Sequence, residues 1–165
     1  MMDAFDAISK RASVRQYQTR LIERDLLEKL VDAGRRAPTA RAVEPWEFVV
    51  VTDKEILRKL GKIADTGQFI KDAAGCIAVF SHDTKYYLED GCAATENILL
   101  AASAIGLGAC WVAGDKKPYV GEVTDLLGVP PELKLVSLIP LGWPEKEPGQ
   151  IKKRRLDEVL HWERY

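Results

Sequence analysis

The chain has 165 residues, enough for one domain with a substantial hydrophobic core and too few to favour two. Its 24 Lys and Arg residues nearly cancel its 25 Asp and Glu residues, which excludes a global field that would attract nucleic acid and leaves only local basic patches. The three cysteines lack CxxC spacing, so reduced, inert thiols are favoured over a disulfide framework or a zinc site. Acidic residues close to the N-terminus argue against a secretory signal, and we expect a cytoplasmic protein.

The first half of the chain predicts three helices and one buried strand. Asp3 and Asp53 stand at positions suited to helix N-caps. Pro38 ends the helix predicted at about 22–36. The expected elements are helices at 2–10, about 22–36 and 53–63, an exposed turn or extended segment at 12–18, and a strand at 46–51.

The longest uncharged run of the chain predicts a central helix over about 83–105. Its apolar residues cover most of the helix circumference, which is typical of a helix buried on all sides, and Gly106 and Gly108 end it. Many of its residues are small, so the helix of a second copy of the chain is a plausible neighbour. A membrane span is not expected, because Asn97, Ser103 and the glycines leave too short an apolar length.

The second half adds further strands and one helix. Pro118 fits the first turn of that helix, and Gly128 closes it. The expected elements are strands at 76–80, 109–112 and 135–141, a helix at 119–127, a loop at 144–151, and weak helical spacing beyond it. Strands that alternate with helices favour an α+β or three-layer domain in which helices cover a mixed sheet.

The common catalytic motifs do not fit this chain. A G-x-G begins at Gly106, but Trp111 stands where the third glycine of a dinucleotide fingerprint belongs. The sequence has no GK[ST] and no HExxH, and its two histidines are far apart, so no metal ligand set is indicated. Ser13 and Ser137 lie outside G-x-S-x-G, which disfavours hydrolase chemistry.

Two basic segments at opposite ends of the chain have cations at alternating positions. In extended backbone, Arg11, Ser13 and Arg15 would point the same way, and so would Lys153 and Arg155. If the two sets converged, they would hold a phosphate dianion through charge-assisted hydrogen bonds. The alternative, which the residues alone favour, is that both segments are solvated surface.

Four stretches together resemble the FMN-dependent nitroreductase family, along nearly the whole chain. They are KRASVRQY at 10–17, APT at 37–39 with EPWEF at 44–48, GLGACW at 106–111, and KRRL at 153–156. The resemblance implies one FMN-binding domain over 1–165. Its expected fold is an α+β three-layer sandwich with a mixed, mainly antiparallel sheet, forming an intertwined homodimer about a long central helix with FMN at the subunit interface.

The resemblance also implies a set of cofactor-binding residues. Arg11, Ser13 and Arg15 would meet the FMN phosphate and the ribityl or pyrimidine edge, with Lys153 and Arg155 closing on the phosphate. The backbone of the segment Trp111–Gly114 would run beside the isoalloxazine ring, where the N–H of Ala113 or of Gly114 could reach flavin N5. The full set is Arg11, Ala12, Ser13, Arg15, Pro38, Thr39, Gln68, Trp111, Ala113, Gly114, Lys153 and Arg155.

Gln68 would lie over the polar edge of the flavin, and the segment from Pro38 to Ala40 would come from the partner subunit. Trp111 is equally well explained as a core aromatic. Many relatives have Asn and Gln where this chain has Ala42 and Glu44, so a flavin contact from that loop is an open question. The chain also lacks the inserted helices of longer relatives, which leaves the acceptor face of the flavin open.

The implied function is an FMN oxidoreductase that takes a hydride from NAD(P)H at flavin N5 and passes electrons to an acceptor such as a nitroaromatic or quinone. No side-chain acid or base is assigned, because the flavin carries the chemistry. The same fold could instead serve dehalogenation, flavin fragmentation or heterocycle oxidation. A different class of function is a flavin-binding protein without turnover, whose basic tail serves a protein or lipid partner. We expect no nucleic-acid or membrane partner.

Overall fold

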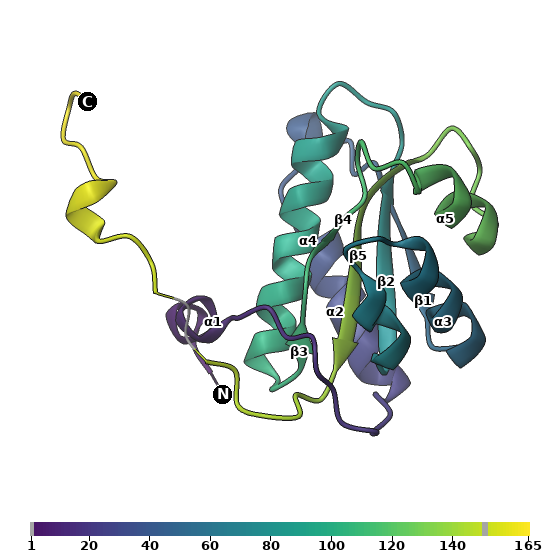
Figure 1. The fold of residues 1–165 in the computed structure, drawn as a ribbon. Coiled ribbons are helices and arrows are strands. Elements are labelled where there is room, and N and C mark those ends of the chain that lie inside the picture. The colour runs from purple at the N-terminus through teal and green to yellow at the C-terminus, as the bar shows by residue number, and fades with distance from the viewer. Residues whose placement is uncertain (1, 150–151) are drawn as a thin grey trace.

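A five-stranded antiparallel sheet forms the middle layer of the computed structural model, which describes residues 2–149 and 152–165 (Figure 1). The helices are α1 (Ala4–Lys10), α2 (Arg24–Arg35), α3 (Lys54–Ile63), α4 (Tyr87–Ala104) and α5 (Val120–Leu127). The strands are β1 (Trp46–Val51), β2 (Gly75–Ser81), β3 (Gly108–Ala109), β4 (Val112–Ala113) and β5 (Lys134–Gly142). Short 3-10 turns are η1 (Ala40–Ala42), η2 (Gln68–Asp72) and η3 (Leu156–Glu158). The strand order is β1-β2-β5-β3, and β4 also pairs with β5.

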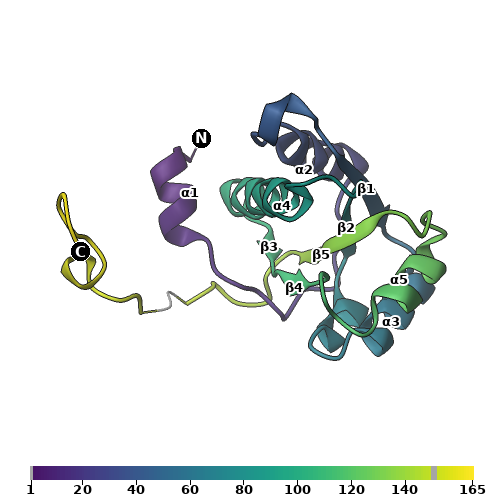
Figure 2. The same ribbon diagram turned by 90° about the horizontal axis from the view of Figure 1, so that it is seen from above.

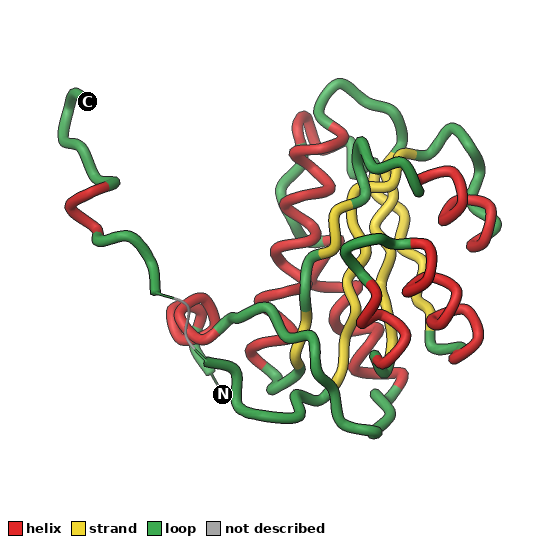
Figure 3. Tube along the Cα trace, viewed as in Figure 1, coloured by secondary structure: helices red, strands yellow, loops and turns green. Residues whose placement is uncertain are grey.

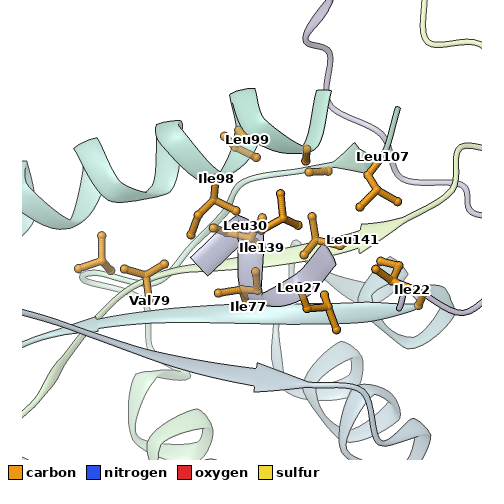
Figure 4. Packing of buried hydrophobic residues seen from close by; sticks show 14 residues of the cluster. Ile22, Leu27, Leu30, Ile77, Val79, Ile98, Leu99, Leu107, Ile139 and Leu141 are labelled. Atoms are coloured by element: carbon orange, nitrogen blue, oxygen red, sulfur yellow. The ribbon is translucent and has the colours of Figure 1, made fainter. Parts of the chain in front are cut away.

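Helices cover both faces of the sheet, so the expected α+β sandwich is confirmed. Seen from above, α2 and α4 lie over one face and α3 and α5 over the other, with α1 beside α4 (Figure 2). One core cluster joins α2 and α4 to the sheet through residues such as Leu30, Ile98 and Ile139 (Figure 4). A second cluster joins α3 and α5 to the opposite face. Both central strands, β2 and β5, are therefore buried on both faces and read as continuous apolar runs.

The predicted capping residues act as expected. The Asp3 carboxylate accepts a hydrogen bond from the Asp6 N–H, and the Asp53 carboxylate accepts from the N–H groups of Glu55 and Ile56. Gly128 ends α5 in the left-handed conformation, with φ of 64°.

The central helix α4 starts four residues later than the sequence predicts. Thr84 donates its N–H to the His82 carbonyl and Tyr87 donates to the Thr84 carbonyl, so this stretch forms a turn. Asp83, the first residue of the predicted helix, lies before this turn and pairs with Lys134 of β5. One face of α4 is buried against the sheet, whereas the face that includes Leu100 is half-exposed in the single chain.

The strand expected over 109–112 is split into β3 and β4. Cys110 donates its N–H to the Pro140 carbonyl of β5. In an antiparallel ladder this pair should exchange two hydrogen bonds, but Pro140 has no N–H to donate in return. The ladder therefore breaks at this pair and resumes at Val112.

The strand at 46–51 has the predicted bounds but is not buried along its length. Among the strands of the described residues, β1 lies at the edge of the sheet and pairs with β2 alone. Val50 is 41% exposed, although both ends of the strand are buried. Phe48 packs on the α2 and α4 side of the sheet and Val49 on the α3 and α5 side, so both faces of β1 are partly covered.

The chain beyond β5 runs away from the sheet as an extended arm (Figures 1 and 3). Its weak helical spacing yields only the 3-10 turn η3, and the α-helix suggested there does not form. Every residue of 152–165 is exposed, including Leu156 at 71% and Trp162 at 76%. Across 2–149 and 152–165, no helix combines the length and the hydropathy needed to cross a membrane.

The extended segment expected at 12–18 is tied to the sheet at two bridges, although Arg15, Gln16 and Gln18 are exposed. Ser13 forms a parallel bridge with Ala109, and Val14 donates its N–H to the Ala109 carbonyl at 2.9 Å. Val14 can approach this closely because Gly108 has no side chain. A Cβ on Gly108 would lie 2.6 Å from Cγ1 of Val14.

Gly108→Ala should lower the free energy of unfolding by about 1–3 kcal/mol, because the added methyl group displaces Val14 and the segment around it. Denaturant unfolding of the purified protein measures this change. Gly121→Ala in α5 is the matched control, since nothing lies within 4 Å of a Cβ there. Alanine should instead stabilise that helix by up to about 1 kcal/mol. Equal stability of the two variants would show that Val14 yields freely and that the close approach is unimportant.

Candidate functional site

The first basic segment gathers around the thiol of Cys110. Burial raises the pKa of Cys110, whereas the charge of Arg15, a hydrogen bond with Ser13 and the charge of Arg11 each lower it. The pKa of one thiol thus responds to all three side chains, which lie near β3, where Ser13 bridges Ala109. That the three side chains point the same way stays a prediction. Ala12 lies between them and is half-buried.

The guanidinium groups of Arg11 and Arg15 contact different parts of the protein. Nε of Arg11 lies 3.8 Å from Oε1 of Glu96 on α4. The guanidinium carbon of Arg15 lies 5.7 Å from the centre of the Phe69 ring in η2. Arg15 is exposed and makes no ion pair with a described residue, so it retains its hydrogen-bonding capacity for an anion. Arg11 is partly neutralised by Glu96 and is the weaker candidate.

The turn η2 brings Gln68 beside β4. Gly67 is buried, and a Cβ added there would lie 3.0 Å from Cγ1 of Val112. This close contact holds the start of η2 against β4. The Gln68 side chain is exposed at that point, and the neighbouring Phe69 carries the Arg15 contact. Phe69 therefore joins the candidate site, although no sequence motif marked it.

Hydrogen-bond alternation along β4 distinguishes the two predicted backbone donors. Gly114 donates its N–H to the Val136 carbonyl at 3.0 Å, so this donor is already used within the sheet. Ala113 pairs with Ser137 at the intervening, non-hydrogen-bonded position. Its N–H and C=O therefore point away from β5, at an exposed residue. Ala113, and not Gly114, offers an N–H to a ligand.

The side chain of Trp111 packs in the protein core. The ring is half-buried and packs against the core cluster on the α4 side of the sheet. This favours the core-aromatic interpretation of the side chain and leaves its backbone in the segment that leads to Ala113.

Pro38 and Thr39 lie apart from the first basic segment, on the loop that follows α2. The carboxylate of Asp90 on α4 is buried and accepts the Ala40 N–H at 3.0 Å. Beyond it, Arg41, Ala42 and Glu44 have positive φ of 60°, 53° and 51°. Non-glycine residues adopt this conformation rarely and at some cost, and such strain concentrates at functional loops. Asp90 was not anticipated from the sequence, because an acid near a helix start has ordinary explanations.

Lys153 and Arg155 are not brought to the first basic segment within one chain. Both are exposed on the C-terminal arm. Arg155 pairs with Asp157, and Arg154 donates to the Glu158 carbonyl at 2.8 Å. The proposed phosphate clamp of the two basic segments is therefore not formed by the single chain and stays a prediction.

All three cysteines are free. Burial raises the pKa of the Cys76 thiol to about 12 and also raises that of Cys92. These thiols are protonated at neutral pH and unsuited to nucleophilic attack, because the thiolate is the reactive form.

The geometry places a cation, an amide side chain and a free backbone N–H along one edge of the sheet. A sequence model of the nitroreductase family matches residues 8–87 and 66–143, which include all three. The chain belongs to the nitroreductase family. The matched ranges also include β5 and α4, so the family match covers the scaffold as well as the site.

Relatives and solved structures agree with this membership. A Methanothermobacter thermautotrophicus protein, whose name proposes an NADH dehydrogenase/NAD(P)H nitroreductase, is 35% identical over 154 residues, covering 90% of this chain and 81% of the relative. An FMN-dependent nitroreductase of Clostridium difficile superposes with a TM-score of 0.88 at 28% identity, covering 96% of this chain and 98% of that one. A nitroreductase-family structure from Desulfovibrio desulfuricans in complex with FMN has a TM-score of 0.87 at 27% identity, covering 98% and 97%.

Proposed function

We propose that this chain is a cytoplasmic, single-domain FMN-dependent oxidoreductase that passes electrons from NAD(P)H through flavin N5 to a small acceptor such as a nitroaromatic or quinone. The observation that carries the proposal is the free N–H of Ala113, at an exposed position of β4 beside the turn η2 that carries Gln68. Family membership and the FMN complex of the Desulfovibrio protein support the choice of FMN.

The donor set of this chain fits the parts of FMN. Arg15 and the Ser13 hydroxyl supply the charge and hydrogen bonds that a phosphate requires. The Gln68 amide can both donate and accept, which suits the polar edge of a flavin ring. The Ala113 N–H suits a ring nitrogen acceptor such as N5.

Bound FMN would supply the hydride chemistry, and the residues of this chain would hold and orient it. With FMN bound, Ala113 would offer its N–H to N5 and orient that edge of the ring, and Arg15 and Ser13 would hold the phosphate end. With the ring edge and the phosphate of FMN both held, the remaining requirement for hydride transfer would be to place the nicotinamide over the ring. No described side chain near Ala113 is placed as an acid or base in this proposal.

We also propose that the active form is an intertwined homodimer. The half-exposed face of α4 carries Leu100, which belongs to no core cluster of the single chain. The C-terminal arm exposes Leu156 and Trp162, which are better accommodated against a second copy than in water. In that dimer, Pro38 and Thr39 would reach the flavin of the partner, and Lys153 and Arg155 would meet a flavin phosphate at the interface.

The direct test of function is cofactor content and turnover. The purified protein should be yellow, release FMN on denaturation, and oxidise NADH or NADPH in the presence of a quinone. Protein that binds FMN but is bleached by neither nicotinamide would be a flavin-binding protein without turnover. A colourless protein that cannot be reconstituted with FMN would exclude the proposal.

Arg15→Ala and Arg155→Ala should each weaken FMN binding by roughly ten- to a hundred-fold, because each removes a charge-assisted contact with the phosphate. Fluorescence titration of the apoprotein measures the affinity. Riboflavin, which lacks the phosphate, should bind all variants similarly. The double variant should be less than additive, since both residues share one ligand group.

Arg154→Ala is the matched control for the arm, because alternation turns its side chain away from those of its neighbours. It should bind FMN nearly as wild type does. Wild-type affinity in Arg155→Ala as well would assign the arm to solvated surface and leave the phosphate to the first basic segment.

Leu100→Arg should convert the dimer to a monomer, because it places a charge without a partner in the proposed helix contact. Sedimentation of the wild-type protein should give about twice the chain mass, consistent with a closed two-fold assembly. Glu122→Arg on the exposed side of α5 is the control and should leave the mass unchanged. A wild-type protein that sediments as a folded monomer would contradict the assembly.

A further inference from the structure

Tyr119 forms a part-buried hydrogen bond with Ala113, the residue that the proposed function places at flavin N5. It is the N-cap of α5, is 3% exposed, and packs in the core cluster on the α3 and α5 side of the sheet. Its hydroxyl donates to the carbonyl oxygen of Ala113. Burial raises the pKa of Tyr119, so the hydroxyl is protonated and available as a donor at neutral pH.

The position of Ala113 in β4 gives this bond its significance. Because Ala113 is at a non-hydrogen-bonded pair with Ser137, its N–H and its C=O both point to the side away from β5. The N–H donor and the C=O acceptor of Ala113 thus lie on the same side of β4. Tyr119 occupies the carbonyl, and the N–H beside it stays free.

We propose that Tyr119 is a positioning residue for the flavin site, acting through Ala113; this inference rests on the proposed function. Its hydroxyl fixes the orientation of Ala113, so the N–H keeps its direction toward the ligand. The hydroxyl also offsets the negative end of the Ala113 carbonyl dipole. This dipole would lie close to flavin N5, where reduction adds electron density. Both effects favour the reduced cofactor at this site.

The ring of Tyr119 alone would explain its burial, so the test must isolate the hydroxyl. Tyr119→Phe keeps the ring in the core and removes only the O–H. Tyr87→Phe is the matched control, since the Tyr87 hydroxyl donates to Oδ1 of Asp115 at 2.7 Å, in the same neighbourhood but not on Ala113. Each variant loses one tyrosine hydroxyl bond.

The midpoint potential of the FMN holoprotein is the main readout. Tyr119→Phe should lower the two-electron potential, because the freed carbonyl presents its negative end to the flavin. A roughly tenfold change in the ratio of reduced to oxidised flavin corresponds to about 30 mV. The visible absorption bands of the bound flavin should shift as well. Tyr87→Phe should keep the potential and the spectrum of the wild type.

Exchange of the Gly114 amide in the apoprotein, followed by NMR with labelled glycine, provides a readout that needs no cofactor. This N–H shares the peptide plane of the Ala113 carbonyl and is protected by its hydrogen bond to Val136. Tyr119→Phe should accelerate this exchange, and Tyr87→Phe should not. An unchanged exchange rate together with an unchanged potential would overturn the inference. Equal potential shifts in both variants would also overturn it, since Tyr119 would then be one structural tyrosine among others. Wild-type protein that binds no FMN would instead refute the proposed function.

Discussion

The hydrogen-bond ladder of β5 is the constraint on which the site depends. This strand is buried along its length and pairs with β2 on one side and with β3 and β4 on the other. Antiparallel pairing alternates between positions that exchange hydrogen bonds and positions that do not. That alternation fixes which backbone groups of the neighbouring strand are used inside the sheet. It leaves Ala113 free and commits Gly114.

Pro140 has a second effect on the same ladder. Its missing N–H interrupts the pairing at Cys110 and divides one expected strand into two. The break falls where the N-terminal segment joins the sheet through Ser13 and Ala109. The same thiol, Cys110, lies close enough to Arg11, Ser13 and Arg15 for all three to affect its pKa. Local positive charge is thus gathered at one strand in a chain whose net charge is only −1.

The single chain builds one part of the site and leaves others separate. The strained loop after α2 is held by Asp90, far along α4 from the end that contacts α1. The C-terminal arm is exposed and projects from the sheet (Figure 1). One face of α4 is only half-covered. In the proposed dimer, a second copy would cover the open face of α4 and would contact the arm and the loop. This is the physical argument for proposing that the cofactor lies at a subunit interface.

The sequence by itself determined the elements whose causes are local. Caps at Asp3 and Asp53, the stop at Gly128 and the apolar runs of β2 and β5 follow from short-range spacing, so their bounds were predicted to within a few residues. The residue types suited to a phosphate and a flavin were also visible, through resemblance to a family. The tertiary structure decided the rest. The sheet order made β1 an edge strand, and a proline on the neighbouring strand β5 separated β3 from β4. The alternation of hydrogen-bonded pairs between β4 and β5 left the N–H of Ala113 free and used that of Gly114. The tertiary structure also placed Tyr119 against Ala113 and Phe69 against Arg15, and it placed Asp90 against the separate loop that follows α2, with no motif to mark any of them. These outcomes depend on pairing between residues distant in the chain, which local spacing does not encode.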